Sequence, residues 1–507
     1  MTSLISRFRW PMRGLMAMTL ALVFALSSTI SAFAFTLVQI SSDPYTNSTS
    51  QHKTEVEPDT LSSGSTIVST FQVGRFFNGG ASNIGFATST NGGSSFTSGF
   101  LPGTTPFSTP PSTVYARVSD PSVAFDAKHG VWLISFLGLF PNGNGAEVDV
   151  LVSRSTDATG TVWGSPIVVN NDGHFNDKNW TVCDSTASSP HFGNCYTEFD
   201  DNTLGDLIQM STSSDGGLTW GAGQSTANKA HGIGGQPLVQ PNGTVIVPIN
   251  GFTGGPGFNF LVVAFTSTDG GASWSKTNIV ARVGFHHAAG NIRDSIPLPS
   301  AEMDASGKVY VVWQDCHFEP TCNASDLVLN TSTNGKSWSK LTRIPLDPRG
   351  SGVDHFIPGL AVDRSTSGSS ARLAVAFYYY PNTNCTASTC ELDVGSSTSA
   401  DGGATWTPRT KLAGPMTLSW LPNTTQGRMV GDYISTSFSG SPAFPAFALA
   451  NAPTSGGSDC ATATPNCDEA TYTVQGGLSV SSHGNPATDQ TNAGGNNVQT
   501  GSSITDQ

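Results

Sequence analysis

The chain has 507 residues, of which 56 are glycine and only 12% are charged, and its formal net charge is −13 at pH 7. A chain this acidic is not expected to bind nucleic acid or an anionic membrane surface. Few charged residues together with abundant Gly, Ser, Thr and Asn are typical of many short strands joined by turns.

The first 34 residues have the pattern of a secretory signal peptide. Arg7, Arg9 and Arg13 precede an apolar run over residues 15–30, and Ala32-Phe33-Ala34 forms a small-x-small cleavage site. The apolar run is short for a bilayer span, and the cleavage site follows it at once. We therefore expect residues 1–34 to be removed and the mature protein to be secreted, without membrane insertion.

A polar turn that ends in an aromatic residue recurs six times, with starts 54 to 67 residues apart. Its Asp, or Asn in two copies, accepts hydrogen bonds from backbone N–H groups ahead of it, and its glycines adopt backbone angles that other residues disfavour. The aromatic residue opens the next strand and can pack between neighbouring sheets. The motif therefore predicts a structural hairpin rather than a catalytic element. The copies are Ser89–Phe96, Ser155–Trp163, Ser213–Trp220, Ser267–Trp274, Ser332–Trp338 and Ser399–Trp406.

A second repeated segment, usually containing proline, stands before each turn and opens a β-rich run. We expect its proline to be the first residue of a strand, where no ladder partner is needed. Each unit then has four antiparallel strands. The segments start at Glu57-Pro58, Asp120-Pro121, Gln236-Pro237, Leu298-Pro299 and Ile357-Pro358, and at Asp177 and Gly431 without the proline.

Seven such starts predict an all-β fold, a β-propeller of seven four-stranded blades over residues 35–480, with six blades as the alternative. Because the seventh unit has no Asp-turn, we expect its inner strands at residues 433–438, 444–450 and 471–475. Its outer strand would come from residues 35–41, which closes the ring and hides the sheet edges. Residues 481–507 are expected to form a disordered polar tail.

The repeated turn, as in Ser213–Trp220 (SSDGGLTW), resembles the Asp-box, or bacterial neuraminidase repeat, of sialidase-like β-propellers. The resemblance implies an exo-glycosidase that binds a substrate carboxylate with three arginines and uses a tyrosine nucleophile and a carboxylic acid. The chain differs from the family in the segment Tyr115–Pro121, which only faintly matches the aromatic-Arg-Ile-Pro signature. In the family a glutamate activates the tyrosine, but Glu302 of this chain lies toward the far end of its strand. The implied candidates are Arg117, Arg293 and Arg428 for the anion, Tyr433 as nucleophile, and Asp59 or Asp120 as acid.

Charged residues recur at the starts of the predicted inner strands, which converge around a propeller axis. This placement predicts a polar pocket there, although the same residues could also cap loops and pair with one another. Besides the three arginines, the predicted substrate-binding residues are Asp177, Asp294, His355 and Asp432; Glu57 and Lys178 occupy equivalent positions.

The eight cysteines form four close pairs, which in an exported chain predict local disulfides. None has the spacing of a zinc site. The loop Asn170–Asp177 has oxygen ligands that could hold Ca²⁺, but its irregular spacing favours an Asx-turn loop, and we expect no cofactor. The pairs are Cys183/Cys195, Cys316/Cys322, Cys385/Cys390 and Cys460/Cys467.

Two functions remain open at this point. The first is a secreted sialidase-like enzyme that acts on or binds extracellular glycans through the axial pocket. The alternative is a non-catalytic extracellular scaffold that binds protein or polysaccharide on one rim.

Overall fold

The computed structural model describes residues 35–141, 147–253, 259–294, 296–454, 457–460, 467–481, 484–487 and 490–491. The predicted signal peptide lies outside these residues, and the described strands belong to one unit that begins at Thr36. None of the described helices has the length and hydropathy needed to cross a bilayer. The all-β class is confirmed, because the helical segments among the described residues are short 3-10 turns, at Asn202–Leu204, Ala289–Asn291, Gly368–Ser370 and Leu418–Trp420.

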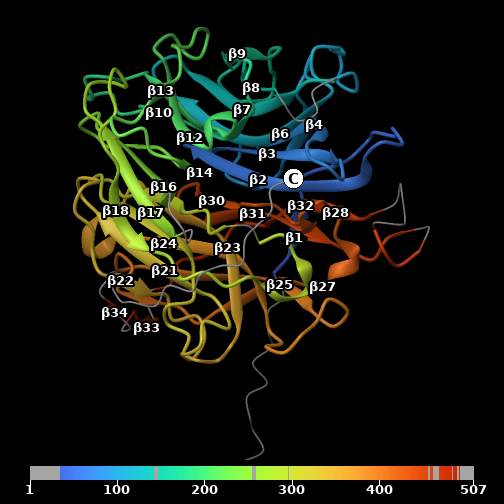
Figure 1. The fold of residues 1–507 in the computed structure, drawn as a ribbon, viewed down its shortest axis with the longest axis vertical. Helices are drawn as coiled ribbons and strands as arrows, with labels where there is room; N and C mark the ends of the chain where they lie inside the picture. The colour runs from blue at the N-terminus through green and yellow to red at the C-terminus, as the bar shows by residue number, and fades with distance from the viewer. Residues whose placement is uncertain are drawn as a thin grey trace, which may run out of the picture. The chain divides into compact units, whose positions relative to one another are not determined.

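The strands pair antiparallel in consecutive groups along the chain (Figure 1). The first three groups are β2 (Gln51–Ser63), β3 (Thr66–Arg75), β4 (Ala81–Ser89) and β5 (Thr97–Phe100); β6 (Arg117–Asp126), β7 (Val131–Leu139), β8 (Val148–Arg154) and β9 (Ile167–Asn170); and β10 (Asn176–Cys183), β11 (Cys195–Asp201), β12 (Leu207–Ser213) and β13 (Gln224–Ser225).

The next three groups are again made of strands that follow one another along the chain. They are β14 (Gly232–Ile233) with β15 (Leu238–Val239), β16 (Val245–Thr253), β17 (Asn259–Ser267) and β18 (Asn278–Arg282); β19 (Ser300–Met303), β20 (Val309–Asp315), β21 (Asp326–Ser332) and β22 (Leu341–Arg343); and β23 (Asp354–Val362), β24 (Leu373–Tyr380), β25 (Glu391–Ser399) and β27 (Thr410–Thr417).

The last group combines the two ends of the chain. It consists of β30 (Ser435–Phe438), β31 (Ala443–Ala450), β32 (Glu469–Val474) and the N-terminal β1 (Leu37–Gln39). β1 pairs antiparallel with β32, as the sequence predicts, and Leu37 lies opposite Val474. β32 also bridges to β2, which brings the last sheet beside the first (Figure 1).

Part of the predicted disordered tail is paired with the sheets. β33 (Asn485–Pro486) pairs with β26 (Thr405–Trp406), and β34 (Gln490–Thr491) pairs with the outer strand β22. Outer strands present unpaired N–H and C=O groups that even a polar segment can satisfy. The boundary expected at residue 481 is therefore too early for these residues.

The same β-bulge interrupts the first strand of four groups, namely β2, β6, β10 and β23. In each, one extra residue breaks the register, and the first bulged residue has a left-handed backbone although it is not glycine. The residues are Glu57, Asp120, Lys178 and Ile357, with φ of 54°, 49°, 47° and 52°.

The predicted position of three prolines, at the first residue of a strand, is wrong. Pro58, Pro121 and Pro358 lie inside their strands rather than at the first residue, directly after the left-handed residue. The bulge leaves the backbone nitrogen at that point without a ladder partner, so proline is tolerated there.

Hydrogen bonds join the first strands of neighbouring groups. Asp59 Oδ2 accepts from the backbone N–H of Val123 at 2.7 Å, so a carboxylate of β2 holds β6 in place. Ser122 Oγ, Gln236 Oε1 and Ser300 Oγ accept in the same way from Thr181, Ala301 and Leu360, at 3.1, 2.8 and 2.9 Å.

The repeated turns join neighbouring groups at the outside. In Ser213–Trp220, Asp215 Oδ1 accepts from the N–H groups of Leu218 and Thr219, at 3.1 and 3.0 Å, which confirms the predicted Asx-type turn. One glycine of each turn has φ between 67° and 85°, and a β-carbon there would lie within 3.0 Å of a side chain of the preceding group. These contacts are Gly160 on Val68, Gly217 on Leu133, Gly271 on Tyr196, Gly335 on Ile246 and Gly403 on Leu329; Gly93 meets Phe444 of the last group.

We expect Gly217→Ala to lower the free energy of unfolding by about 2–4 kcal/mol. The substitution strains a positive φ and places a β-carbon 2.8 Å from Leu133. Gly130→Ala is the matched control, because Gly130 also has positive φ but nothing lies within 4 Å of the added carbon. Denaturant unfolding should show a smaller loss, of about 1 kcal/mol, for the control. Equal losses of stability in the two variants would contradict the packing role of Gly217.

Candidate functional site

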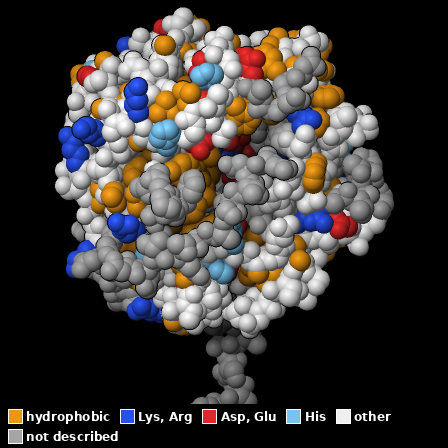
Figure 2. Space-filling view, in the orientation of Figure 1, with side chains coloured by type: hydrophobic (Ala, Val, Ile, Leu, Met, Phe, Trp, Pro, Cys, Tyr) orange, Lys and Arg blue, Asp and Glu red, His pale blue; other side chains and the backbone are white. Residues whose placement is uncertain are grey.

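Five charged side chains from the starts of separate strand groups meet in one buried place. We call Glu57, Asp120, Lys178, Arg293 and Asp432 the charge cluster. One carboxylate oxygen of each of its three acids lies within 4.8 Å of the others. In Figure 2, acidic side chains also line a hollow near the middle of the face shown.

Lys178 is the centre of the charge cluster. Its Nζ lies 2.5 Å from Asp432 Oδ2, 2.7 Å from Asp120 Oδ1 and 3.6 Å from Glu57 Oε1. Arg293 Nε donates to Asp432 Oδ1 at 2.6 Å, and its Nη2 donates to Oδ2, so the pair is bidentate. Two cations thus offset most of the charge of three acids.

The left-handed bulges direct three of these side chains. Glu57, Asp120 and Lys178 are the first residues of their bulges, and each bears about 1–2 kcal/mol of backbone strain. Strain at equivalent charged residues is typical of functional sites. Gly431 completes the arrangement, since a β-carbon there would lie 2.9 Å from the backbone nitrogen of Glu57.

Burial and neighbouring charges shift the pKa values of Glu57 and Asp432 in opposite directions. Burial, with the nearby Asp120 and Asp432 charges, raises the pKa of Glu57 to about 7, although Lys178 opposes the shift. Burial alone would raise the pKa of Asp432, but Arg293 and Lys178 outweigh it and hold that pKa well below its usual range. At neutral pH the cluster therefore has one carboxyl group that exchanges a proton and one that stays ionised.

Two further predicted residues border the charge cluster. Burial and the Asp120 charge raise the pKa of Asp177 to about 6. The hydroxyl of Tyr433 donates to the carbonyl of Pro121 at 2.9 Å, and its ring packs 5.2 Å from that of Trp180. Burial raises the pKa of Tyr433 well above its usual value. These contacts fit a packing role for Tyr433 better than that of a nucleophile.

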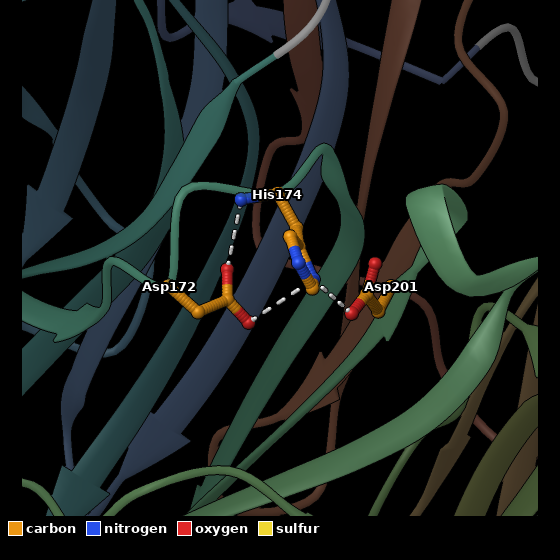
Figure 3. A group of neighbouring side chains, drawn as sticks. All are labelled: Asp172, His174 and Asp201. Carbon is orange, nitrogen blue, oxygen red and sulfur yellow. Dashed lines mark hydrogen bonds and ion pairs between the residues drawn. The ribbon is translucent and has the colours of Figure 1, made fainter.

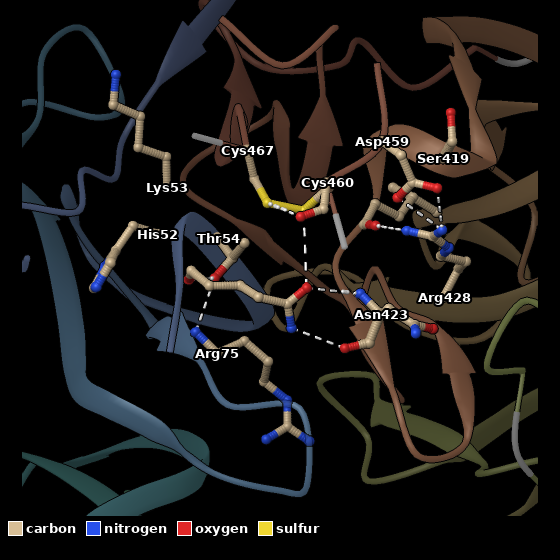
Figure 4. Close-up of a disulfide and its surroundings, with 12 residues drawn as sticks. His52, Lys53, Thr54, Arg75, Ser419, Asn423, Arg428, Asp459, Cys460 and Cys467 are labelled. Carbon is tan, nitrogen blue, oxygen red and sulfur yellow. Dashed lines mark hydrogen bonds and ion pairs between the residues drawn. A yellow bond between two sulfur atoms is a disulfide. The ribbon is translucent and has the colours of Figure 1, made fainter. Parts of the chain in front are cut away.

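Two of the three predicted arginines point to other partners. Arg117 stacks on the ring of Phe76 at 4.1 Å and donates to Asn78 Oδ1 at 2.7 Å. Arg428 Nη2 lies 2.9 Å from both carboxylate oxygens of Asp459, next to the Cys460–Cys467 disulfide (Figure 4). The arginine triad is therefore not assembled, because only Arg293 belongs to the charge cluster.

The other predicted residues have structural partners. Asp59 binds the backbone of β6, as described above. Asp294 Oδ2 accepts from the N–H of Ala288 at 2.7 Å. His355 Nε2 lies 3.0 Å from Asp347 Oδ2, and Arg409 Nε donates to the same oxygen at 2.8 Å. None of these interactions reaches the charge cluster.

The structure adds residues that the sequence reasoning missed. Gln72 Nε2 donates to Glu57 Oε2, and Arg75 Nε donates to Met429 Sδ at 3.2 Å. Asp200 lies opposite Asp177 in the β10–β11 pair, and both its oxygens lack partners among the described residues. A usable signal was present, since Gln72 and Asp200 are polar residues inside strands that are otherwise built for burial.

The loop considered for Ca²⁺ has a histidine between two carboxylates. His174 Nδ1 lies 2.7 Å from Asp201 Oδ2, and Asp172 Oδ1 accepts from the N–H of His174 at 3.1 Å (Figure 3). The second contact is an Asx turn, which the sequence favours for this loop. An imidazole among the donors does not fit the oxygen ligands that calcium prefers.

A separate cavity of about 240 Å³ lies at the opposite ends of the first strands. Its lining includes Ser62, Ser437 and Glu302, and Glu302 pairs with Arg364 at 3.0 Å. Glu302 is thus at the far end of its strand, as expected. None of the charge-cluster residues lines this cavity.

All four predicted disulfides are confirmed. They join Cys183 to Cys195, Cys316 to Cys322, Cys385 to Cys390 and Cys460 to Cys467.

Comparison with known families identifies the repeats. Residues 142–358 match the family model of a BNR repeat-like domain. This part of the chain is a BNR repeat-like domain. The resemblance drawn from the six polar turns of the chain is therefore confirmed. No curated protein matches this chain.

Several solved structures of similar fold have low sequence identity to this chain. An ulvan lyase, a polysaccharide lyase bound to -[GlcA(1-4)Rha3S]-, has a TM-score of 0.50 at 10% identity, over 88% of this chain and 97% of that one. A Hadza microbial sialidase has 0.43 at 13%, over 71% and 66%. The Penicillium chrysogenum α-L-arabinanase with arabinobiose has 0.45 at 14%, over 68% and 93%. At these identities the similarity concerns the fold alone.

We expect Lys178→Met to lower the free energy of unfolding of the protein by about 3–5 kcal/mol, because it leaves buried carboxylates without their shared cation. Arg364→Met is the control, since the exposed pair with Glu302 contributes about 1 kcal/mol or less. Denaturant unfolding at pH 7 measures both. A Lys178→Met protein as stable as the control would show that the ammonium does not hold the cluster together.

Proposed function

We propose that the protein is a secreted seven-bladed β-propeller that cleaves glycosidic bonds of extracellular glycans at the charge cluster. The observation that carries the proposal is the convergence of three carboxylates, one of which, Glu57, has a pKa of about 7. A glycoside-cleaving site needs a carboxylic acid that holds a proton near neutral pH beside a second carboxylate.

Several features support a closed ring of seven blades. The strand groups number seven among the described residues, and β1 completes the last of them. Gly93 of the first group packs on Phe444 of the last, repeating the contact between neighbouring groups. Four disulfides and the predicted signal peptide support secretion.

The geometry supports roles that differ from those suggested by the family resemblance. Glu57 is the proton donor, and Asp120 is the carboxylate that attacks or stabilises the sugar centre. Their oxygens lie within 4.8 Å, closer than the roughly 6.5–9.5 Å between the carboxyl groups of inverting glycosidases. The spacing therefore favours retention of configuration. Arg293 fixes Asp432, and Lys178 holds Asp120 in place.

Glycans are the proposed substrate class, and sialosides are the first to test. The ulvan lyase of similar fold is named for a polysaccharide, and the Asp-box resemblance points to exo-acting sialidases. Only Arg293 of the three predicted anion-binding arginines is at the cluster, so neutral glycosides belong in the same panel.

A non-catalytic scaffold is the second candidate. It is favoured by the internal pairing of the charge cluster and by the buried state of Glu57, which is 1% exposed. In that case the disulfide-closed loops would bind polysaccharide or protein, and no glycoside would be cleaved.

We expect Glu57→Gln and Asp120→Asn to reduce glycoside turnover by at least about 100-fold, because each removes a group that acts on the scissile bond. Initial rates on fluorogenic sialosides and neutral glycosides measure this. Glu302→Gln, at the separate cavity, is the matched control and should keep full activity. Absence of turnover by the wild-type protein across the panel would remove the enzyme proposal and leave the scaffold.

We expect activity to fall as the pH rises through about 7. Glu57 acts as an acid only in its protonated form, and that form is lost above its raised pKa. A pH–rate profile of kcat/KM measures the descending limb. A wild-type profile without a descending limb between pH 6 and 8 would assign the proton donor to another residue.

A further inference from the structure

A second group of buried acids lies where the last sheet meets the first. Glu55 of β2 is 1% exposed, and Glu469 of β32 is fully buried. The two strands touch here, because Thr54 pairs with Glu469 across a parallel bridge. This place is the junction of the two ends of the chain; Glu55 lies two residues before Glu57 of the charge cluster in the same strand.

Four oxygen atoms at this junction have no hydrogen-bonding partner among the described residues. They are Glu55 Oε1, both carboxylate oxygens of Glu469, and the hydroxyl of Thr471. Thr471 is fully buried and lies two residues after Glu469, so both side chains point to the same face of β32. A buried carboxylate without a partner is costly, and a native structure rarely leaves one unexplained.

Ser41 ties these residues together. Its hydroxyl donates to Glu55 Oε2 at 2.5 Å and accepts from the N–H of Thr471 at 2.7 Å. The segment that continues β1 therefore links the first strand of one sheet to the third strand of the other. Burial raises the pKa of Glu469 well above its usual value and the charge of Glu55 raises it further, so the two acids lie near each other.

The surroundings supply no cation for these two acids. No ion pair joins Glu55 or Glu469 to Lys, Arg or His in the described part of the chain. Burial is the largest cause of the raised pKa of Glu55; Asp43 and Asp468 raise it further, and Lys53 lowers it with the smallest effect. The nearby His52 pairs with Asp43 at 2.9 Å rather than with either of these two acids.

We propose that Glu55, Glu469 and Thr471 bind a calcium ion that fastens the closing strands of the ring. Carboxylate and hydroxyl oxygens are hard donors, and two acids match a divalent ion. Calcium fits better than magnesium, because calcium accepts irregular geometry whereas magnesium demands a near-ideal octahedron; backbone carbonyls or waters would complete its roughly six to eight ligands. The proposal is independent of the glycan activity.

The test measures bound metal and thermal stability of the mature full-length chain purified without chelator. We expect about one equivalent of calcium per chain by elemental analysis. Treatment with EDTA should lower Tm by about 5 °C, and Ca²⁺, but not Mg²⁺, should restore it. Burial raises the pKa of Glu55 to about 8, so the calcium-dependent rise in Tm should grow between pH 6 and 8 as protons leave.

Substitutions test which residues bind the ion. Glu469→Gln and Thr471→Val should weaken calcium binding at least about 10-fold, whereas Glu302→Gln should bind as the wild type does. Asp172→Asn tests the other acidic group of Figure 3. Loss of calcium in Asp172→Asn but not in Glu469→Gln would overturn the proposal. The proposal would also be overturned if the wild-type protein contained no calcium, if its Tm did not change on adding Ca²⁺, and if Glu469→Gln had a higher Tm than the wild type. That result would mean that the acids are simply protonated.

Discussion

The centre of this protein depends on one ammonium group. Lys178 lies between 2.5 and 3.6 Å from three carboxylates that come from three different strand groups. Without a cation there, the acids would repel one another in a medium of low dielectric constant. The first strands of these groups can approach one another because Lys178, helped by Arg293, balances the charge.

The backbone supports this arrangement at a cost. Left-handed bulges at Glu57, Asp120 and Lys178 store strain. Bonds such as that from Val123 to Asp59 fix the neighbouring strands. Outside them, glycines of the repeated turns pack on the preceding group where no β-carbon would fit. The same repeat thus stabilises the assembly and leaves its inner positions free to carry charge.

Charge is handled differently at two places in the molecule. In the charge cluster, side-chain cations meet the acids, and burial raises the pKa of Glu57 whereas Arg293 and Lys178 hold that of Asp432 low. At the junction of the chain ends, Glu55 and Glu469 have no such partners. The first arrangement suits proton transfer, whereas the second suits an ion from solution. The charge cluster and the junction of the chain ends therefore balance their buried charges in different ways.

Local chemistry in the sequence determined much of the architecture. The turn motif, the disulfide pairs and the N-terminal strand could all be predicted, because each depends on short-range geometry or on a regular period. The convergence of Asp120, Arg293 and Asp432 was also accessible, since equivalent positions in repeats gather around one axis.

Only the tertiary structure decided which charges meet. Arg117, Arg428 and His355 occupy positions like that of Arg293, yet each has a partner that belongs to its own loop or to a neighbouring one. The bulges could not be read from the sequence either, because a proline is equally acceptable at a strand start and after a left-handed residue. Pairing between side chains distant in sequence depends on direction and distance, and a one-dimensional period carries neither.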